Sequence, residues 1–445
     1  MRIRTLLCSA LLLMGGQVFA FSPRVNQQEN SAEEPAESYV LSLDQAKEMS
    51  LEYNRSLKNA GLTIEQANAS TWEAISQGLP QLSATVDYSS FFGASNSMEM
   101  APGASTIIEF NNTSNLNLTA SQLLFSGSYI VGLQTAKLYE AMVAKSAEKT
   151  ELDVKQQVAD AYYAILLAEK TKEILEQNLA NVIDLRDKTE QMYNAGVAEL
   201  TDVDQLSIQV TMLESSLRTT ARQTSLAYDL LKLQIGISPL SDVELNQTMD
   251  DFFLPENFYA ALLRAFNVAE NVDYQLVEQQ VALTDKQVSL AKMEYLPTIA
   301  AGYNYLYQII EPNFNMTPKN TLQLNMSIPI FSSGQRKAKV SQAKIDWEMA
   351  ENNRLQLNDA LLTQDRTIKT NLKTALDQYE AQEKNVEVAK RVFDNINRKY
   401  EAGMVSSLDL TTANTNYLNA ESSYIQAMLD VLKAYVEIER FYNTI

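Results

Sequence analysis

Histidine is absent from the 445 residues, and Cys8 is the single cysteine. Without histidine the chain lacks the usual general base, the usual catalytic triad and the commonest protein ligand for metals. We therefore expect no enzyme, no catalytic residues, no cofactor and no metal site. The net charge of −19 also argues against nucleic acid as a partner, because phosphate binding needs a basic surface.

Long hydrophobic runs are scarce as well, and the one candidate is N-terminal. Basic Met1–Arg4 precedes apolar Leu6–Met14, and Gln17–Ala20 ends in a small-residue cleavage pattern, so residues 1–20 are predicted to be a signal peptide. Cys8 lies inside the apolar segment, which argues against lipoprotein cleavage there. A buried N-terminal helix is the alternative. No later stretch reaches the ~18 apolar residues of a spanning helix, so a mature chain that enters a membrane must do so as a β-barrel.

Two long segments almost lack the residues that interrupt helices. Residues 128–235 contain no proline, and their only glycines are Gly132 and Gly196; residues 335–445 contain no proline and only Gly403. A helix of about 65 residues, some 100 Å long, can run up to Gly196, and each long helix is predicted to turn back at its glycine. After each glycine, apolar residues recur at steps of three and four, which is typical of a coiled coil. They are Val203, Leu206, Val210, Leu213 and Leu217, then Leu410, Ala413, Tyr417, Ala420 and Tyr424.

The two turns also share a motif, Y-x-x-G-x5-D. It occurs at Tyr193–Asp202 and again at Tyr400–Asp409, each residue 207 positions after its counterpart. Repetition at one offset indicates an internal duplication. We divide the chain into a disordered leader (21–41), a first repeat (42–236), a connector with a short helix at about 256–268 (237–268) and a second repeat (269–445).

Each repeat is predicted to begin with a helix that stops at Leu-Pro, over about 42–77 and 273–294. The returning helix is only half as long as the long helix, so we expect this first helix to cover the remainder. Strands with alternating polar and apolar residues follow, at about 81–92, 113–125, 298–310 and 320–331, and polar loops join them in pairs.

Four strands cannot close a barrel alone, whereas three chains would supply twelve, within the range of outer-membrane barrels. The apolar face would meet lipid and the polar face water. Aromatic residues gather near the strand ends, as interfacial aromatics do; they are Tyr88, Phe91, Phe92, Phe110, Phe125, Tyr303, Tyr307 and Phe331. The alternative is a soluble β-layer whose apolar face packs on helices.

This order of elements resembles the TolC family of outer-membrane efflux proteins, from about Ser42 to Tyr442. The resemblance implies a mainly α fold with a transmembrane β-barrel contribution: a homotrimer whose helical hairpins form an α-barrel in the periplasm, below a 12-stranded barrel in the outer membrane of a Gram-negative bacterium. It implies a passive exit duct of a tripartite efflux or secretion system, working with a periplasmic adaptor (membrane fusion protein) and an inner-membrane transporter.

In that family the hairpin turns dock the adaptor. They correspond here to Gly196, Val197, Leu200 and Thr201, and to Gly403, Met404, Ser407 and Leu408. Each glycine also has a local reason, since a helix C-terminus commonly needs a left-handed residue. Thr201, Asp202 and Asp409 can likewise cap the returning helices.

The resemblance further implies tips that close the duct at rest. Tyr400 occupies the position of a linking tyrosine, Asp202 that of its partner, and Asp409 that of a ring carboxylate that would narrow the pore and favour cations. A solvated aspartate at a helix start is the alternative for Asp409. Val405 stands where some members have an arginine link, and Thr412 where some have a second ring aspartate, so we expect a differently held and less acidic constriction.

Two other classes remain as alternatives: a soluble periplasmic coiled-coil scaffold and a hydrolase built on carboxylate pairs. The acidic residues lie on helix faces between apolar stripes, which is how solvated charges are placed. Drug efflux, metal efflux and protein secretion all remain open, because cargo specificity is expected to reside in the inner-membrane pump.

Overall fold

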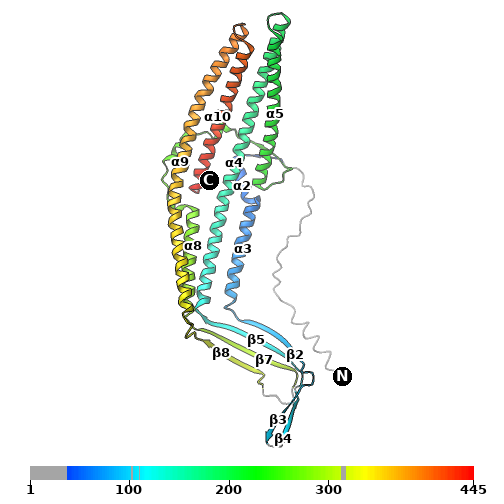
Figure 1. Ribbon diagram of the computed structural model, residues 1–445, viewed down its shortest axis with the longest axis vertical. Helices are drawn as coiled ribbons and strands as arrows, with labels where there is room; N and C mark the ends of the chain where they lie inside the picture. Colours follow the sequence, from blue (N-terminus) through cyan, green and yellow to red (C-terminus); the bar gives the residue numbers. More distant parts are fainter. Residues whose placement is uncertain (1–37, 102–103, 110, 312–316) are drawn as a thin grey trace.

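A computed structural model describes residues 38–101, 104–109, 111–311 and 317–445 (Figure 1). The predicted signal peptide, most of the predicted leader and Phe110 lie outside these residues. The molecule is elongated, with helices over most of its length and strands at one end (Figure 1). None of the described helices combines the length and the apolar character needed to cross a bilayer.

Both repeats follow the predicted order of helix, strand pair, long helix and returning helix. The first consists of α2 (Leu43–Tyr53), α3 (Arg55–Ser76), β2 (Gln81–Ser89), β5 (Thr113–Ser126), α4 (Gly127–Asn194) and α5 (Leu200–Ile235). The second consists of α8 (Val272–Met293), β7 (Thr298–Ile310), β8 (Asn320–Ser327), α9 (Gln335–Glu401) and α10 (Ser407–Phe441). The connector holds β6 (Asp242–Leu245), α6 (Met249–Phe252), α7 (Pro255–Leu263) and the 3₁₀ turn η1 (Val268–Glu270).

The single helix predicted over 42–77 is wrong, because the chain breaks at Asn54 into α2 and α3. The Asn54 side-chain Oδ1 accepts hydrogen bonds from the backbone N–H groups of Ser56 (2.7 Å) and Leu57 (3.2 Å). Asparagine competes in this way with the helical hydrogen bonds of its own backbone, so it favours a helix start over a helix interior.

Three further predictions need correction. The last residues of the predicted disordered leader form β1 (Ser38–Leu41), which pairs in parallel with β6. The short connector helix is α7, which ends at Leu263 rather than Val268. The long loop between the first two strands contains a hairpin, β3 (Ser95–Ala101) with β4 (Ala104–Glu109).

The four main strands form one antiparallel sheet in the order β2-β5-β7-β8. Its register confirms the predicted alternation, since one face places apolar residues opposite one another and the other face places polar ones. Leu82, Ala120, Tyr303 and Leu322 form one apolar row, and Ser83, Thr119, Asn304 and Thr321 form the next, polar row. Leu82 and Leu322 are each 80% exposed. No described helix covers this face, so the alternative of a soluble layer packed on helices is wrong for the described chain.

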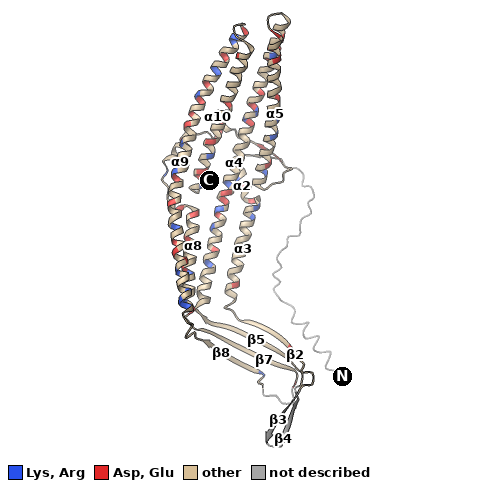
Figure 2. Ribbon diagram, viewed as in Figure 1, with Lys and Arg blue, Asp and Glu red and all other residues tan. Residues whose placement is uncertain are grey.

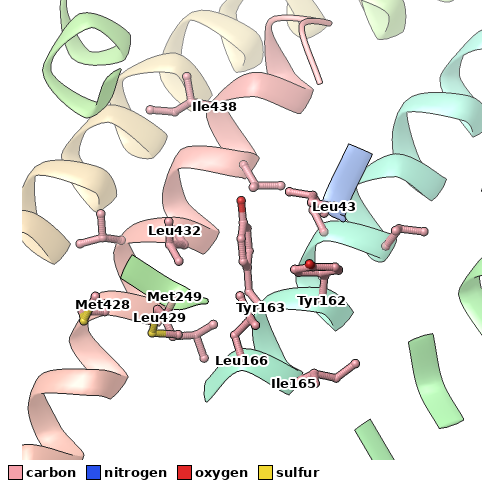
Figure 3. Close-up of a cluster of buried hydrophobic side chains, with 14 of the residues drawn as sticks. Leu43, Tyr162, Tyr163, Ile165, Leu166, Met249, Met428, Leu429, Leu432 and Ile438 are labelled. Atoms are coloured by element: carbon pink, nitrogen blue, oxygen red, sulfur yellow. The ribbon is translucent and has the colours of Figure 1, made fainter. Parts of the chain in front are cut away.

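The main core lies midway along the helices, where α4 and α10 meet the N-terminal and connector segments (Figure 3). Tyr162 is fully buried there, and its Oη donates a hydrogen bond to the backbone carbonyl of Leu41, 3.1 Å away. This core therefore joins both repeats. The drawn side chains include Leu43, Tyr162, Tyr163, Ile165, Leu166, Met249, Met428, Leu429, Leu432 and Ile438 (Figure 3).

Between core and sheet, α3 packs on α4 and α8 packs on both α4 and α9 (Figure 1). This arrangement confirms that the first helix of each repeat covers the part of the long helix that the returning helix does not reach. Toward the opposite end, the hairpins α4–α5 and α9–α10 lie side by side, and α10 contacts α4.

Candidate functional site

The two hairpin turns lie at the end of the molecule opposite the sheet (Figure 1). Gly196 and Gly403 have φ of +75° and +67°, the left-handed region that L side chains rarely adopt. In the first turn the N–H of Val197 donates to the carbonyl of Met192 (2.9 Å), and in the second the N–H of Met404 donates to that of Lys399 (2.9 Å). Each long helix thus ends in the same glycine-dependent C-cap.

The turns expose apolar side chains beyond these glycines. Val197 is 72% and Met404 74% exposed, and Leu200 and Leu408 are also exposed. Thr201 is exposed, and its Oγ1 donates to Glu199 Oε2 (3.1 Å). Ser407 is the exception among the predicted docking residues, because it is buried.

Two aspartates cap the returning helices, as the sequence suggested. Asp202 Oδ2 accepts a hydrogen bond from the N–H of Glu199 (3.2 Å). Asp409 Oδ2 accepts from the N–H (3.1 Å) and the hydroxyl (2.8 Å) of Ser406, and the Ser406 hydroxyl accepts from the N–H of Asp409 (3.2 Å). These bonds from Ser406 hold the pKa of Asp409 below its ordinary value. Asp409 is therefore an exposed anion at neutral pH, and Thr412, one turn further on, is also exposed.

Polar contacts link the two hairpins near the tips, but not in the predicted pairing. Tyr400 Oη lies 2.9 Å from Thr189 Oγ1, and both residues are buried. Because the Thr189 hydroxyl already donates to the carbonyl of Leu185 (2.9 Å), Tyr400 is the donor. Burial raises the pKa of Tyr400, the hydrogen bond to Thr189 lowers it in part, and the charge of Asp202 raises it further, so its proton is retained.

Asp202 is bonded to Ser407 instead, whose hydroxyl donates to its carboxylate. The sequence interpretation named Tyr400 and Asp202 but missed Thr189 and Ser407 as their partners. A repeat search identifies residues that recur at one offset, and the partner across two hairpins carries no such signal.

A further link lies deeper. The amides of Asn178 on α4 and Asn414 on α10 are buried and exchange two hydrogen bonds, with Nδ2–Oδ1 distances of 2.9 and 3.2 Å. Next to it, the hairpins enclose a cleft of about 220 Å³. Most of its lining side chains are polar or charged; they include Asp184, Lys188, Gln209, Asn397 and Glu401. Between these hairpins near the tips, polar contacts and a polar cleft thus accompany the apolar contacts.

The family match decides the identity. The family described as "Outer membrane efflux protein" matches residues 47–234 and 268–444. The chain belongs to the outer membrane efflux protein family. The gap between the matched segments falls on the connector, so the family pattern covers both repeats.

Curated relatives and solved structures agree with this family. The chain is 23% identical over 408 residues to the outer membrane protein TolC of Vibrio cholerae, covering 86% of this chain and 89% of the relative. It is 25% identical over 402 residues to the pyoverdine export outer membrane protein OpmQ of Pseudomonas aeruginosa, covering 88% and 83%.

Solved structures share the fold at lower identity. Crystal structures of CusC superpose with a TM-score of 0.74 at 16% identity, covering 93% of this chain and 95% of that one. The outer membrane protein VceC of Vibrio cholerae gives a TM-score of 0.72 at 16% identity, covering 90% and 95%. The protein is thus an outer-membrane protein with the fold of efflux channels, as predicted, and it is not an enzyme.

Proposed function

We propose that three copies of this chain form a channel whose sheet spans the outer membrane and whose helices form a periplasmic duct, serving as the passive exit of a tripartite efflux or secretion system. The observation that carries this proposal is the four-stranded sheet with one exposed apolar face and one polar face. Charged residues are spread along the helices, whereas the strands carry almost none (Figure 2). Such a band, apolar outside and polar inside, is what an outer-membrane barrel requires.

The unpaired edge strands of the described sheet support the proposed closure of three copies into a ring. Within the described chain, β2 and β8 each have a neighbour on one side only, and an unpaired strand edge is a template for pairing with another chain. The helices offer two opposite surfaces in the same way, because α9 and α5 lie on opposite sides of the molecule (Figure 1). Both expose apolar side chains; they are Ile345, Met349, Leu355, Val388 and Val392 on α9, and Ile208, Met212, Leu226, Leu230 and Leu233 on α5. Joining one edge to the opposite edge of the next copy is a head-to-tail contact, which closes into a ring when three such rotations complete one turn.

The tips are the part of the chain proposed to meet other proteins. Their exposed Val197, Leu200, Met404 and Leu408 offer four apolar side chains beyond the ends of the coiled coils. An adaptor bound there would connect the duct to an inner-membrane transporter. The links Tyr400–Thr189, Ser407–Asp202 and Asn178–Asn414 are proposed to hold the hairpins in a resting arrangement, with Asp409 at the constriction.

Native mass of the protein extracted from outer membranes in mild detergent tests the assembly. A trimer that conducts ions in a planar bilayer supports the duct. A monomer found in the soluble periplasmic fraction contradicts it and favours the periplasmic scaffold. For docking, a photo-crosslinking residue is placed at Met404 and, as control, at exposed Lys172 on α4, which belongs neither to the tips nor to the edge residues named above. Crosslinks to a periplasmic adaptor from Met404 alone are expected, whereas equal yields from both positions would contradict docking at the tips.

A further inference from the structure

The four strands of the sheet carry a single charge between them. Among the residues of β2, β5, β7 and β8, Asp87 is the only Asp, Glu, Lys or Arg. Its neighbours along β2, Val86 and Tyr88, are exposed on the apolar face. Because side chains alternate along a strand, Asp87 lies on the polar face, in the row with Asn115 and Gln308.

Two amides on the adjacent strand fix this carboxylate. Asn115 Nδ2 donates to Asp87 Oδ2 (2.9 Å), and Asn117 Nδ2 donates to Asp87 Oδ1 (3.0 Å). None of the ion pairs found within the described residues includes Asp87. Neutral amide donors orient a carboxylate without cancelling its charge, so Asp87 presents an oriented negative charge without an ion-pair partner among the described residues. The nearest described cation on this face is Lys319, directly before β8; its carbonyl accepts from the N–H of Leu306 (2.8 Å), and alternation places it one row from Asp87.

We propose that the three Asp87 carboxylates of the assembled channel form a ring that makes its membrane section prefer cations, as a selectivity element separate from Asp409 at the tips. The inference rests on the proposed trimeric duct, in which the polar face lines the pore. Asp87 lies about 20 Å along β2 from Gln81 at about 3.3 Å per residue. The ring therefore lies toward the end of the sheet remote from the helices, the end a solute meets last on its way out.

The expected strength follows from the dimensions of the barrel. Twelve strands about 4.8 Å apart and tilted by about 40° give a wall radius of about 12 Å. The Debye length is about 30 Å at 0.01 M salt and about 3 Å at 1 M. Three charges on the wall therefore act across the whole pore in dilute salt and only close to the wall in concentrated salt.

The competing interpretation is that Asp87 serves only as a hydrogen-bond acceptor between β2 and β5. Reversal potentials of the purified trimer in planar bilayers, under a KCl gradient, separate the two. For Asp87→Asn we expect the K⁺/Cl⁻ permeability ratio to fall roughly threefold near 10 mM salt and to stay almost unchanged near 1 M. A second variant, Asp87→Asn with Ser83→Asp, returns a carboxylate to the same face of β2 and is expected to restore the preference.

If the wild type and Asp87→Asn give the same reversal potential at low salt, the inference is wrong, while the proposed duct stands. A shift that Ser83→Asp fails to reverse would overturn it as well, because charge on the face would then not be the cause. A wild-type protein that forms no pore would overturn the proposed duct, and the selectivity ring with it.

Discussion

The side-chain Nδ2 of Asn54 donates a hydrogen bond to the backbone carbonyl of Gln234, 2.6 Å away, joining the start of α3 to the end of α5. The second repeat builds the same contact, where Asn271 Nδ2 donates to the carbonyl of Phe441 (3.0 Å) at the end of α10. Both asparagines are buried, and both use Oδ1 to cap the helix that follows. Each one therefore fastens the short helix beside the sheet end-to-end to the returning helix.

Replacement of Asn54 by alanine should therefore destabilise the protein strongly. It removes an N-cap worth about 0.5–2 kcal/mol and leaves the part-buried carbonyl of Gln234 without its donor, which costs up to about 1–3 kcal/mol. We expect a clear fall in the thermal unfolding midpoint at fixed protein concentration. Asn54→Ser keeps a side-chain acceptor for the cap but is too short to reach the carbonyl of Gln234, so its effect should be smaller. The control Asn68→Ala, at an exposed position of α3, should change little; an equal loss in both would contradict the role of the contact.

The sequence predicted the architecture well because duplication and periodicity are local signals. The tips repeat at an offset of 207 residues, whereas Leu79-Pro80 and Leu296-Pro297 are 217 apart. The difference falls in the strand region, where the first repeat contains the extra β3–β4 hairpin. Asn54 and Asn271 are likewise 217 residues apart, so the 207-residue repeat that relates the tips does not relate them, and the break at Asn54 carries no repeat signal at that offset.

Partners across the two hairpins could not be predicted for a different reason. Tyr400 and Asp202 are close enough for the charge of Asp202 to raise the pKa of Tyr400, yet each bonds to another residue. Which hydroxyl meets which depends on the rotation of two coiled coils about each other. A heptad pattern defines the buried stripe of each helix but not that rotation.

Asp409 offers a test of charge against helix capping. Asp409→Asn removes the charge and retains an acceptor, so the K⁺/Cl⁻ permeability ratio should fall in dilute salt if three such residues surround the pore. Ser406→Ala breaks the same capping box at a cost of about 1 kcal/mol but leaves the carboxylate, so selectivity should be kept. Unchanged selectivity in both variants would leave Asp409 a capping residue only. Thr412→Asp, one turn further on the exposed side, should strengthen the cation preference.

The pair Asn178–Asn414 is suited to a double-mutant cycle. Asn414→Leu alone leaves the buried amide of Asn178 unpaired, for which we expect a loss of about 1–3 kcal/mol in the free energy of unfolding. Replacing both by leucine removes the unpaired group and should be nearly neutral. Chemical unfolding of the four proteins gives the coupling energy. Additive losses would show that the two amides do not act as a pair.

A pH dependence is expected from Asp273, which lies beside Lys149 and Arg440. Burial favours the neutral acid, but the hydrogen bond and charge of Lys149 and the charge of Arg440 outweigh it, so the pKa of Asp273 lies below its ordinary value. A lowered pKa in the folded state stabilises the fold above the unfolded pKa of about 4, and the benefit is lost as pH falls through the folded value. Asp273→Asn should therefore cost about 1–3 kcal/mol at pH 7 and progressively less as pH falls below the unfolded pKa of about 4, as measured by unfolding midpoints.

Asp160 on α4 should show the opposite trend. Burial raises its pKa, Lys433 on α10 opposes the shift in part, and Glu437 on α10 adds to it. A folded pKa above the unfolded one means that ionised Asp160 destabilises the fold, and the cost grows as pH rises from the unfolded to the folded value. Asp160→Asn should therefore raise the unfolding midpoint at pH 7 and leave it unchanged near pH 3. The unfolding midpoints of Asp160→Asn and Asp273→Asn, measured in the same buffers, should therefore shift in opposite directions at pH 7. Because both substitutions remove one carboxylate from the same region, a common response to pH would mean that net charge, rather than local contacts, governs the stability of this part of the molecule.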